Sequence, residues 1–186
     1  MPEISEDATL VGAAQRGDRA AFGALYQRYA RMVHGILLAR VPIDDVDDLV
    51  QDVFLIALKR LAALREPHSF GPWLAAITRN RANDHYRRFV PQDQLPEDDS
   101  AAPDARAKLR SAEVTATEVL EAVQSLTEAY RETLILRLVE GMTGPEIAVR
   151  TGLTPGSVRG NLHRGMQQLR AKLNPMPARA AEQERS

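Results

Sequence analysis

Apolar residues recur at steps of three and four along most of this chain, which is the spacing of one buried face of an α helix. The longest run lies between Asp18 and Arg40, and its apolar members are Phe22, Leu25, Tyr26, Tyr29, Val33, Ile36 and Leu37. No segment shows the sustained alternation typical of a half-buried strand. The pattern therefore predicts an all-α fold.

Capping and turn residues divide the first half of the chain into helices. Asp18 is a suitable N-cap for the long helix, which Pro42 ends, and a shorter helix over about 9–15 precedes it. A further helix is expected over about 45–64. After the loop at 65–69, Ser69 is expected to cap a helix that runs to about residue 89.

The second half contains the composition of a helix-turn-helix. Helices are expected over about 114–125 and then after Thr127. The stripe of the latter comprises Leu134, Ile135, Leu138 and Val139, and Gly141 ends it. A short helix follows at 146–150, Gly152 lies in its C-terminal turn, and another helix starts near Pro155 or Ser157.

Between these halves the composition changes. Residues 90–107 are rich in proline, acids and alanine and have no apolar period, which predicts a flexible linker. We therefore expect two small helical domains, at 1–90 and 113–174, joined by a linker at 91–112 and followed by a disordered tail at 175–186.

Composition narrows the possible functions. The absence of cysteine excludes disulfides, thiolate zinc sites and a cysteine nucleophile. The net charge is −1, so any nucleic-acid binding must come from local patches. The chain lacks an apolar signal core or an apolar run near the roughly 20 residues that span a bilayer. We expect a cytoplasmic protein without membrane insertion.

Two helices carry such basic patches. From 157 to 173 every charged residue is basic, and Arg159, Asn161, His163 and Arg164 lie off the apolar stripe, as a helix in a major groove requires. The helix before the linker combines Arg79, Arg81, Arg87 and Arg88 with amides and a tyrosine, which suits phosphate contact and base stacking. The alternative for both is an ordinary solvated helix face.

The stretch DDVDDLVQD, at 44–52, contains the D-D-x-x-D spacing of helical magnesium-diphosphate enzymes. The chain offers no second helical acid cluster to face it, and so small a domain leaves little room for a lined pocket. Asp44 or Asp45 is expected to cap the helix. Asp48 and Asp52 repel each other at i, i+4, so capping does not explain them. They form an acidic ridge beside Gln51 that suits a basic partner, and no metal or other cofactor is expected.

Several motifs in order resemble the bacterial sigma factors of the sigma-70 family, specifically the small two-domain extracytoplasmic-function (ECF) group. They are GDRAAFGALYQRYARMVHGIL, then DDLVQDVFLIALKRL, then a match at Phe70, Trp73, Leu74, Ile77, Asn80, Asp84, Arg87 and Arg88. The segment from 126 to 170 follows the pattern of the family's second domain nearly throughout.

The resemblance implies a non-catalytic protein that binds core RNA polymerase, recognises promoter DNA and is restrained by an anti-sigma factor. The polymerase contacts would be Asp48, Leu49, Gln51 and Asp52. The −10 element would be bound by His68 and Ser69 in the 65–69 loop, which would take a flipped base, and by Asn80, Asp84, Arg87 and Arg88. The −35 element would be bound by Thr154, Ser157, Arg159, Asn161, His163 and Arg164. Gly160 and Asn161 depart from the Ser-Arg common in the family.

Two other classes of protein remain open from the residues themselves. A stand-alone helix-turn-helix regulator would use its first domain to dimerise or sense a ligand, and would bind duplex DNA without polymerase. A magnesium-dependent helical enzyme would use the aspartates at 44–48, and its stability would depend on metal.

Overall fold

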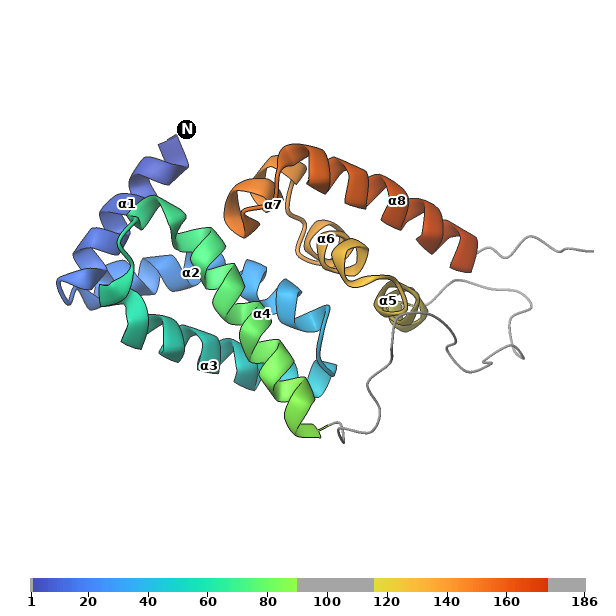
Figure 1. The fold of residues 1–186 in the computed structure, drawn as a ribbon, viewed down its shortest axis with the longest axis horizontal. Coiled ribbons are helices and arrows are strands. Elements are labelled where there is room, and N and C mark those ends of the chain that lie inside the picture. The colour runs from blue at the N-terminus through green and yellow to red at the C-terminus, as the bar shows by residue number, and fades with distance from the viewer. Residues whose placement is uncertain (1, 90–115, 174–186) are drawn as a thin grey trace, which may run out of the picture.

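The computed structural model describes residues 2–89 and 116–173 and is built from helices joined by short turns (Figure 1). The α helices are α1 (Pro2–Gln15), α2 (Arg19–Leu38), α3 (Ile43–Arg60), α4 (Phe70–Phe89), α5 (Ala116–Gln124), α6 (Glu128–Leu138), α7 (Gly144–Thr151) and α8 (Pro155–Leu173). Two short 3-10 helices, η1 (Leu61–Ala63) and η2 (Pro67–Ser69), connect α3 to α4. The described ranges contain no strand, so the all-α prediction is confirmed. The linker and tail predicted at 91–112 and 175–186 lie outside the described residues.

The first domain consists of α1 to α4, and α2 lies at its centre. Leu25, Met32 and Ile36 on α2 are fully buried and belong to the same core as Val53 on α3 and Phe70 on α4. The start of α2 is as predicted, because a carboxylate oxygen of Asp18 accepts hydrogen bonds from the backbone N–H of the second and third residues after it, at 2.9 and 3.1 Å.

Two boundaries differ from those predicted. Helix α3 begins at Ile43 with Pro42 as its N-cap and no side-chain capping bond, so the prediction that Asp44 or Asp45 caps it is wrong. Both aspartates lie in the first turn instead, where their charge complements the helix dipole. Helix α1 is also longer than predicted, since it starts at Pro2.

The second domain consists of α5 to α8 and contains the predicted helix-turn-helix in α7 and α8. The hydroxyl of Thr143 accepts from the N–H of Glu146, and the Glu146 carboxylate accepts in return from the N–H of Thr143 at 2.7 Å, which starts α7. Gly152 ends α7 with φ +78°, a left-handed conformation that favours glycine, and confirms the predicted turn.

The predicted stripe of α6 is partly wrong. Leu138 and Val139 are 47% and 54% exposed, whereas the helix is buried continuously from Glu132 to Leu136. Five consecutive buried positions cannot lie on one face, because successive residues point about 100° apart. Helix α6 is covered from two sides, by α8 of its own domain and by α2 of the other.

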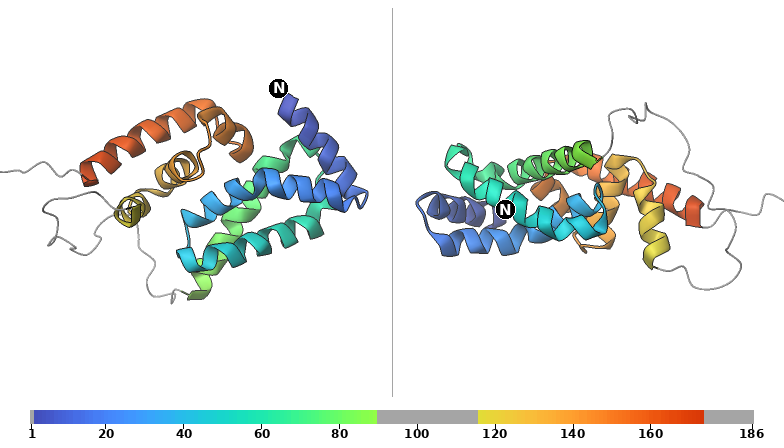
Figure 2. Two further views of the ribbon diagram at one scale, coloured as in Figure 1. Left: turned by 180° about the vertical axis from the view of Figure 1, so that it is seen from behind. Right: turned by 90° about the horizontal axis from the view of Figure 1, so that it is seen from below.

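The two domains pack directly on each other, with α6 against α2 and α7 against α4 (Figure 1). Seen from behind, the second domain again forms its own group of helices beside the first (Figure 2). Glycines allow the close approach: a Cβ at Gly35 would lie 2.8 Å from Leu136 Cδ2, and one at Gly71 would lie 2.9 Å from the carbonyl oxygen of Arg150. Both distances are too short for a real side chain.

Candidate nucleic-acid and protein interfaces

The outward face of α3 combines acidic, amide and aliphatic side chains. Asp48 and Gln51 are exposed, and Leu55 and Leu58 continue the same three- and four-residue steps at 54% and 49% exposure. We name this surface the α3 ridge: Asp48, Gln51, Leu55 and Leu58. The two leucines were missed in the sequence, although their spacing from Gln51 was a sufficient signal.

Leu49, predicted to contact a partner, is only 3% exposed and belongs to the core, so it holds α3 in place instead. Asp52 lies beside the ridge, and its carboxylate accepts from Nη2 and Nε of Arg81 on α4, at 2.6 and 3.2 Å. This ion pair offsets the repulsion between Asp48 and Asp52. Arg81 is therefore engaged with α3 rather than with solvent.

Asp45 is also paired with α4, because its carboxylate lies 3.1 Å from Nε2 of His85. Each of these two aspartates faces a basic group. Within residues 2–89 and 116–173, the histidine, aspartate and glutamate side chains nowhere gather in threes, as a metal site requires.

Helix α4 has one buried face and exposes polar side chains on its outward face. Asn80, Asp84 and Arg87 are exposed at the three- and four-residue spacing of one helix face. Arg88 lies in the last turn of α4, and its side chain is outside the description. His68 and Ser69 are exposed in η2, immediately before α4.

Helix α1 anchors the segment that leads to η2. The side-chain amide of Gln15 donates to the carbonyl oxygens of Leu61 and Leu64, at 3.0 and 2.8 Å, so both bonds fix the course of the chain after α3. No local sequence pattern indicates this anchor, because it joins residues nearly fifty positions apart.

Helix α8 separates its predicted DNA-binding residues into three groups. Thr154 and Ser157 are exposed at its start, where their hydroxyl oxygens lie 2.8 Å apart. Arg159 and His163 are exposed further along. The other two lie against other elements of the same chain. The Arg164 guanidinium lies 5.9 Å from the ring centre of Tyr130 on α6. Asn161 lines a crevice of about 340 Å³ between the domains.

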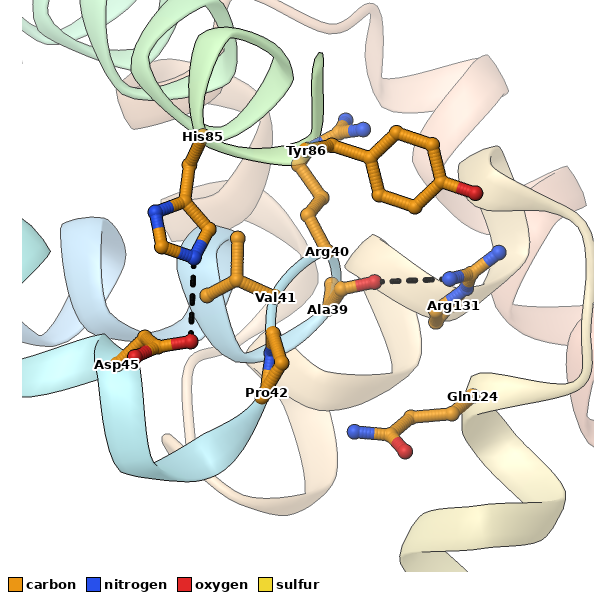
Figure 3. Close-up of a pocket in the computed structure, with 9 residues that line it drawn as sticks. All are labelled: Ala39, Arg40, Val41, Pro42, Asp45, His85, Tyr86, Gln124 and Arg131. Carbon is orange, nitrogen blue, oxygen red and sulfur yellow. Dashed lines mark hydrogen bonds and ion pairs between the residues drawn. The ribbon is translucent and has the colours of Figure 1, made fainter. Parts of the chain in front are cut away.

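A larger cavity, of about 590 Å³, opens on the boundary between the domains (Figure 3). The stretch from Ala39 to Pro42 lines it together with Tyr86 from the first domain and Gln124 and Arg131 from the second. Arg131 Nη1 donates to the Ala39 carbonyl at 3.1 Å. Burial, with a smaller contribution from the charge of Arg40, lowers the pKa of Arg131.

A helical domain with an acidic ridge, beside a helix-turn-helix domain whose second helix is basic, defines a DNA-binding protein that also contacts other proteins. Comparison with known families gives the class its name. Residues 25–89 match the model of Sigma-70 region 2, and residues 116–169 match that of Sigma-70, region 4.

Similarity to individual sigma factors covers nearly the whole chain. The RNA polymerase sigma factor NccH of Alcaligenes xylosoxydans xylosoxydans is 32% identical over 93% of this chain and 97% of its own length. CarQ of Myxococcus xanthus is 32% identical, with 89% and 96% covered. The ECF RNA polymerase sigma-E factor of Haemophilus influenzae is 28% identical, with 95% and 100% covered.

Solved structures agree with this similarity. CnrH, in complex with the cytosolic domain of CnrY, has a TM-score of 0.63 and 28% identity, with 91% of this chain and 98% of CnrH covered. RpoE of Bartonella quintana, in complex with the anti-sigma factor NepR, has a TM-score of 0.56 at 18% identity, over 82% and 96% of the chains, and shares the fold.

The chain belongs to the ECF group of the sigma-70 family. It is a sigma factor, the subunit that binds core RNA polymerase and directs transcription initiation at promoters. Within the ranges that the structure describes, no helix is long and apolar enough to cross a membrane.

Proposed function

We propose that the three exposed surfaces divide the work of this sigma factor. The α3 ridge binds core polymerase, η2 and the outer face of α4 bind the −10 element, and α8 enters the major groove of the −35 element. The observation that carries this assignment is chemical: one face of α3 exposes an aspartate and two leucines, α4 exposes Asn80 and Arg87, and the charged side chains of α8 are all basic.

The individual roles follow from exposure. Asp48 and Gln51 give the polymerase charged and polar contacts, and the exposed leucines of the α3 ridge give it apolar area. His68 and Ser69 receive an extruded base, with Asn80, Asp84 and Arg87 along the strand, and Arg88 is assigned to the same strand by its position in the motif. Arg159 and His163 reach base edges, while Thr154 and Ser157 contact phosphate at the start of α8.

The units of this division are the segments 1–90 and 113–174, and the segment 91–112 connects them. The protein acts as a non-catalytic subunit in the cytoplasm, where the polymerase works. The pairing of Asp45 with His85 and of Asp52 with Arg81 disfavours a magnesium-diphosphate enzyme. The match of residues 25–89 to Sigma-70 region 2 disfavours a regulator that works without polymerase.

An anti-sigma factor is proposed as a further partner. The support comes from CnrH, which is 28% identical and was solved with the cytosolic domain of CnrY bound. A protein that binds across both domains here would cover the cavity of Figure 3 and prevent promoter contact.

Run-off transcription with purified core polymerase and genomic fragments tests the function. We expect promoter-specific transcripts only when this protein is added, and comigration with core polymerase in gel filtration. The absence of both results would refute the proposal. Binding to duplex DNA as a stable dimer, without polymerase, would favour the stand-alone regulator.

A further inference from the structure

The interface between the domains contains ion pairs that centre on one buried carboxylate. Glu132 on α6 is 4% exposed and accepts from two arginines of the first domain: Arg40 Nη2 at 2.5 Å and Arg79 Nη2 at 2.6 Å. Burial alone would raise the pKa of Glu132, but the two arginines outweigh it and lower the pKa, so the carboxylate stays charged. Arg40 also pairs with Glu128 at the edge of the interface.

A second set of contacts joins α7 to α2 and to the start of α4. Arg150 Nη1 donates to the carbonyl oxygen of Arg28 at 2.8 Å, and its guanidinium lies 5.6 Å from the ring centre of Tyr29. Gly152 packs against Pro72, the third residue of α4, where a Cβ would lie 3.0 Å from the Pro72 side chain. The helix-turn-helix thus packs within a few residues of η2.

The closed arrangement conflicts with the proposed function, on which the following inference rests. Elements centred near −10 and −35 are about 25 base pairs apart, or roughly 85 Å at about 3.4 Å per base pair. Two touching domains of under 100 residues, each with a radius of gyration of about 13 Å or less, cannot reach both. In addition, Asn161 faces Arg79 and Glu132 across a crevice too small for duplex DNA.

We propose that this interface is an intramolecular latch that keeps the free protein closed and must open before both promoter elements are bound. The latch comprises Glu132 with Arg40 and Arg79, and the close contact at Gly35. It requires no second protein, which distinguishes it from inhibition by an anti-sigma factor.

One detail of the latch favours its release. The Nε–H of Arg40 is buried and has no hydrogen-bond partner within the described part of the chain. An unpaired buried donor is costly, and opening the interface would expose it to water. The closed state is therefore held by contacts that only partly satisfy Arg40.

Gly35 permits a test that leaves each domain intact. The atoms nearest to a Cβ at this position, Glu140 Cγ and Leu136 Cδ2, both belong to the second domain. The side chain introduced by Gly35→Met therefore pushes the second domain away and does not crowd the first domain, to which Gly35 belongs. Gly23→Met is the matched control, because Gly23 lies on the same helix with nothing within 4 Å of its Cβ. Glu132→Gln removes the charge while keeping the shape.

The chain has no cysteine, so Gln27→Cys with Gln168→Cys, one exposed position in each domain, attaches two spin labels selectively. We expect one short, narrow distance distribution for the otherwise unchanged full chain and for Gly23→Met. Gly35→Met and Glu132→Gln should shift it to longer, broader distances, and so should core polymerase with promoter DNA. A long, broad distribution before any change, or no shift in either variant, would overturn the latch.

A functional measurement separates the latch from the proposed function. If at least nine tenths of the free protein is closed, Gly35→Met should raise its affinity for an active promoter fragment about tenfold or more. Unchanged affinity alongside longer distances would show that closure does not restrict DNA binding, and would refute the latch. Longer distances in a protein that never yields a transcript would leave the latch standing and refute the proposed function.

Discussion

The carboxylate of Asp52 accepts a hydrogen bond from Arg81 at 2.6 Å and so joins α3, which carries the proposed polymerase-binding ridge, to α4, which carries side chains proposed to bind DNA. One ion pair thus sets the position of two proposed binding surfaces relative to each other. Arg81 is 18% and Asp52 46% exposed, so solvent screens the pair only in part.

Asp52→Asn should lower the free energy of unfolding by up to about 1 kcal/mol, because the pair is half-exposed and its charge attraction is discounted for solvent. Urea denaturation followed by circular dichroism measures the loss. Asp48→Asn, on the exposed face of the same helix, is the matched control and should change the stability little. An equal loss in both variants would contradict the structural role of the pair.

Asp48→Arg combined with Gln51→Ala should abolish binding to core polymerase without unfolding the protein, because both side chains are exposed. Leu55→Ala or Leu58→Ala should weaken it.

Leu49→Ala should instead lower the free energy of unfolding by about 2–5 kcal/mol, as loss of a buried leucine does. Comigration with core and thermal unfolding distinguish the two effects. Glu121→Arg, an exposed charge reversal on α5, is the control; weakened core binding there would indicate a nonspecific charge effect.

Arg159→Ala should leave core binding unchanged and weaken promoter selection by about 1–3 kcal/mol, roughly 5- to 150-fold, if its guanidinium reads a base. Competition between promoter and nonpromoter fragments in the transcription assay measures the selectivity. Arg170→Ala is the matched control, since it removes another exposed cation near the other end of α8. A similar loss of selectivity in both variants would indicate that Arg159 contacts a phosphate and does not read a base.

Two glycines of α8 should respond in opposite ways to alanine. Gly160→Ala should raise stability by up to about 1 kcal/mol, because glycine disfavours a helix and only the flexible tip of Arg164 approaches the new Cβ. Gly165→Ala should lower it, since its Cβ would lie 3.0 Å from Leu134 Cδ1 and 3.1 Å from Tyr130 Cβ. Thermal unfolding checks both; a stabilising Gly165→Ala would contradict the packing of α8 on α6.

The contact of His34 with Glu140 should make closure depend on pH. Nδ1 of His34 lies 2.6 Å from Glu140, and this hydrogen bond raises the pKa of His34 above its ordinary value of 6.5 against the effect of burial, with smaller help from the charges of Glu140 and Asp47. Arg31 faces the same carboxylate. Because the pKa of His34 is raised, protonated His34 stabilises the closed state fully below pH 6.5. This stabilisation disappears as the pH rises through the raised pKa of His34.

The spin-label distance measured from about pH 5 to pH 8, the range in which histidines titrate, checks this expectation. The closed fraction should fall toward the alkaline end, and His34→Gln should remove that dependence. The same pH dependence in His34→Gln would assign the effect to another group.

The sequence was sufficient for features that depend on neighbouring residues. The cap at Asp18 and the left-handed turn at Gly152 follow from local backbone chemistry. The start of α3 was missed by two residues, because Asp44 is a good capping residue and Pro42 supplies no side-chain bond.

Features that depend on the second domain could not be predicted. The periodicity of α6 indicates one buried stripe, whereas α6 is buried on two sides, and the stripe assigned to it included the exposed Leu138 and Val139. Arg79 and Asn161 carry charge and amide groups typical of DNA contacts, but both face the boundary between domains. The sequence pattern alone does not show whether such a side chain binds a DNA phosphate or a carboxylate of the same chain, such as that of Glu132.

The missing side chain at Gly35 has a genetic consequence. Nearly any amino acid introduced there would collide with Leu136 and Glu140, whereas the surfaces proposed to bind polymerase and DNA would keep their residues. Selection for bacteria with constitutive expression of the target genes should therefore recover dominant alleles at codon 35. Selection for silent target genes should recover recessive alleles in α3, α4 and α8.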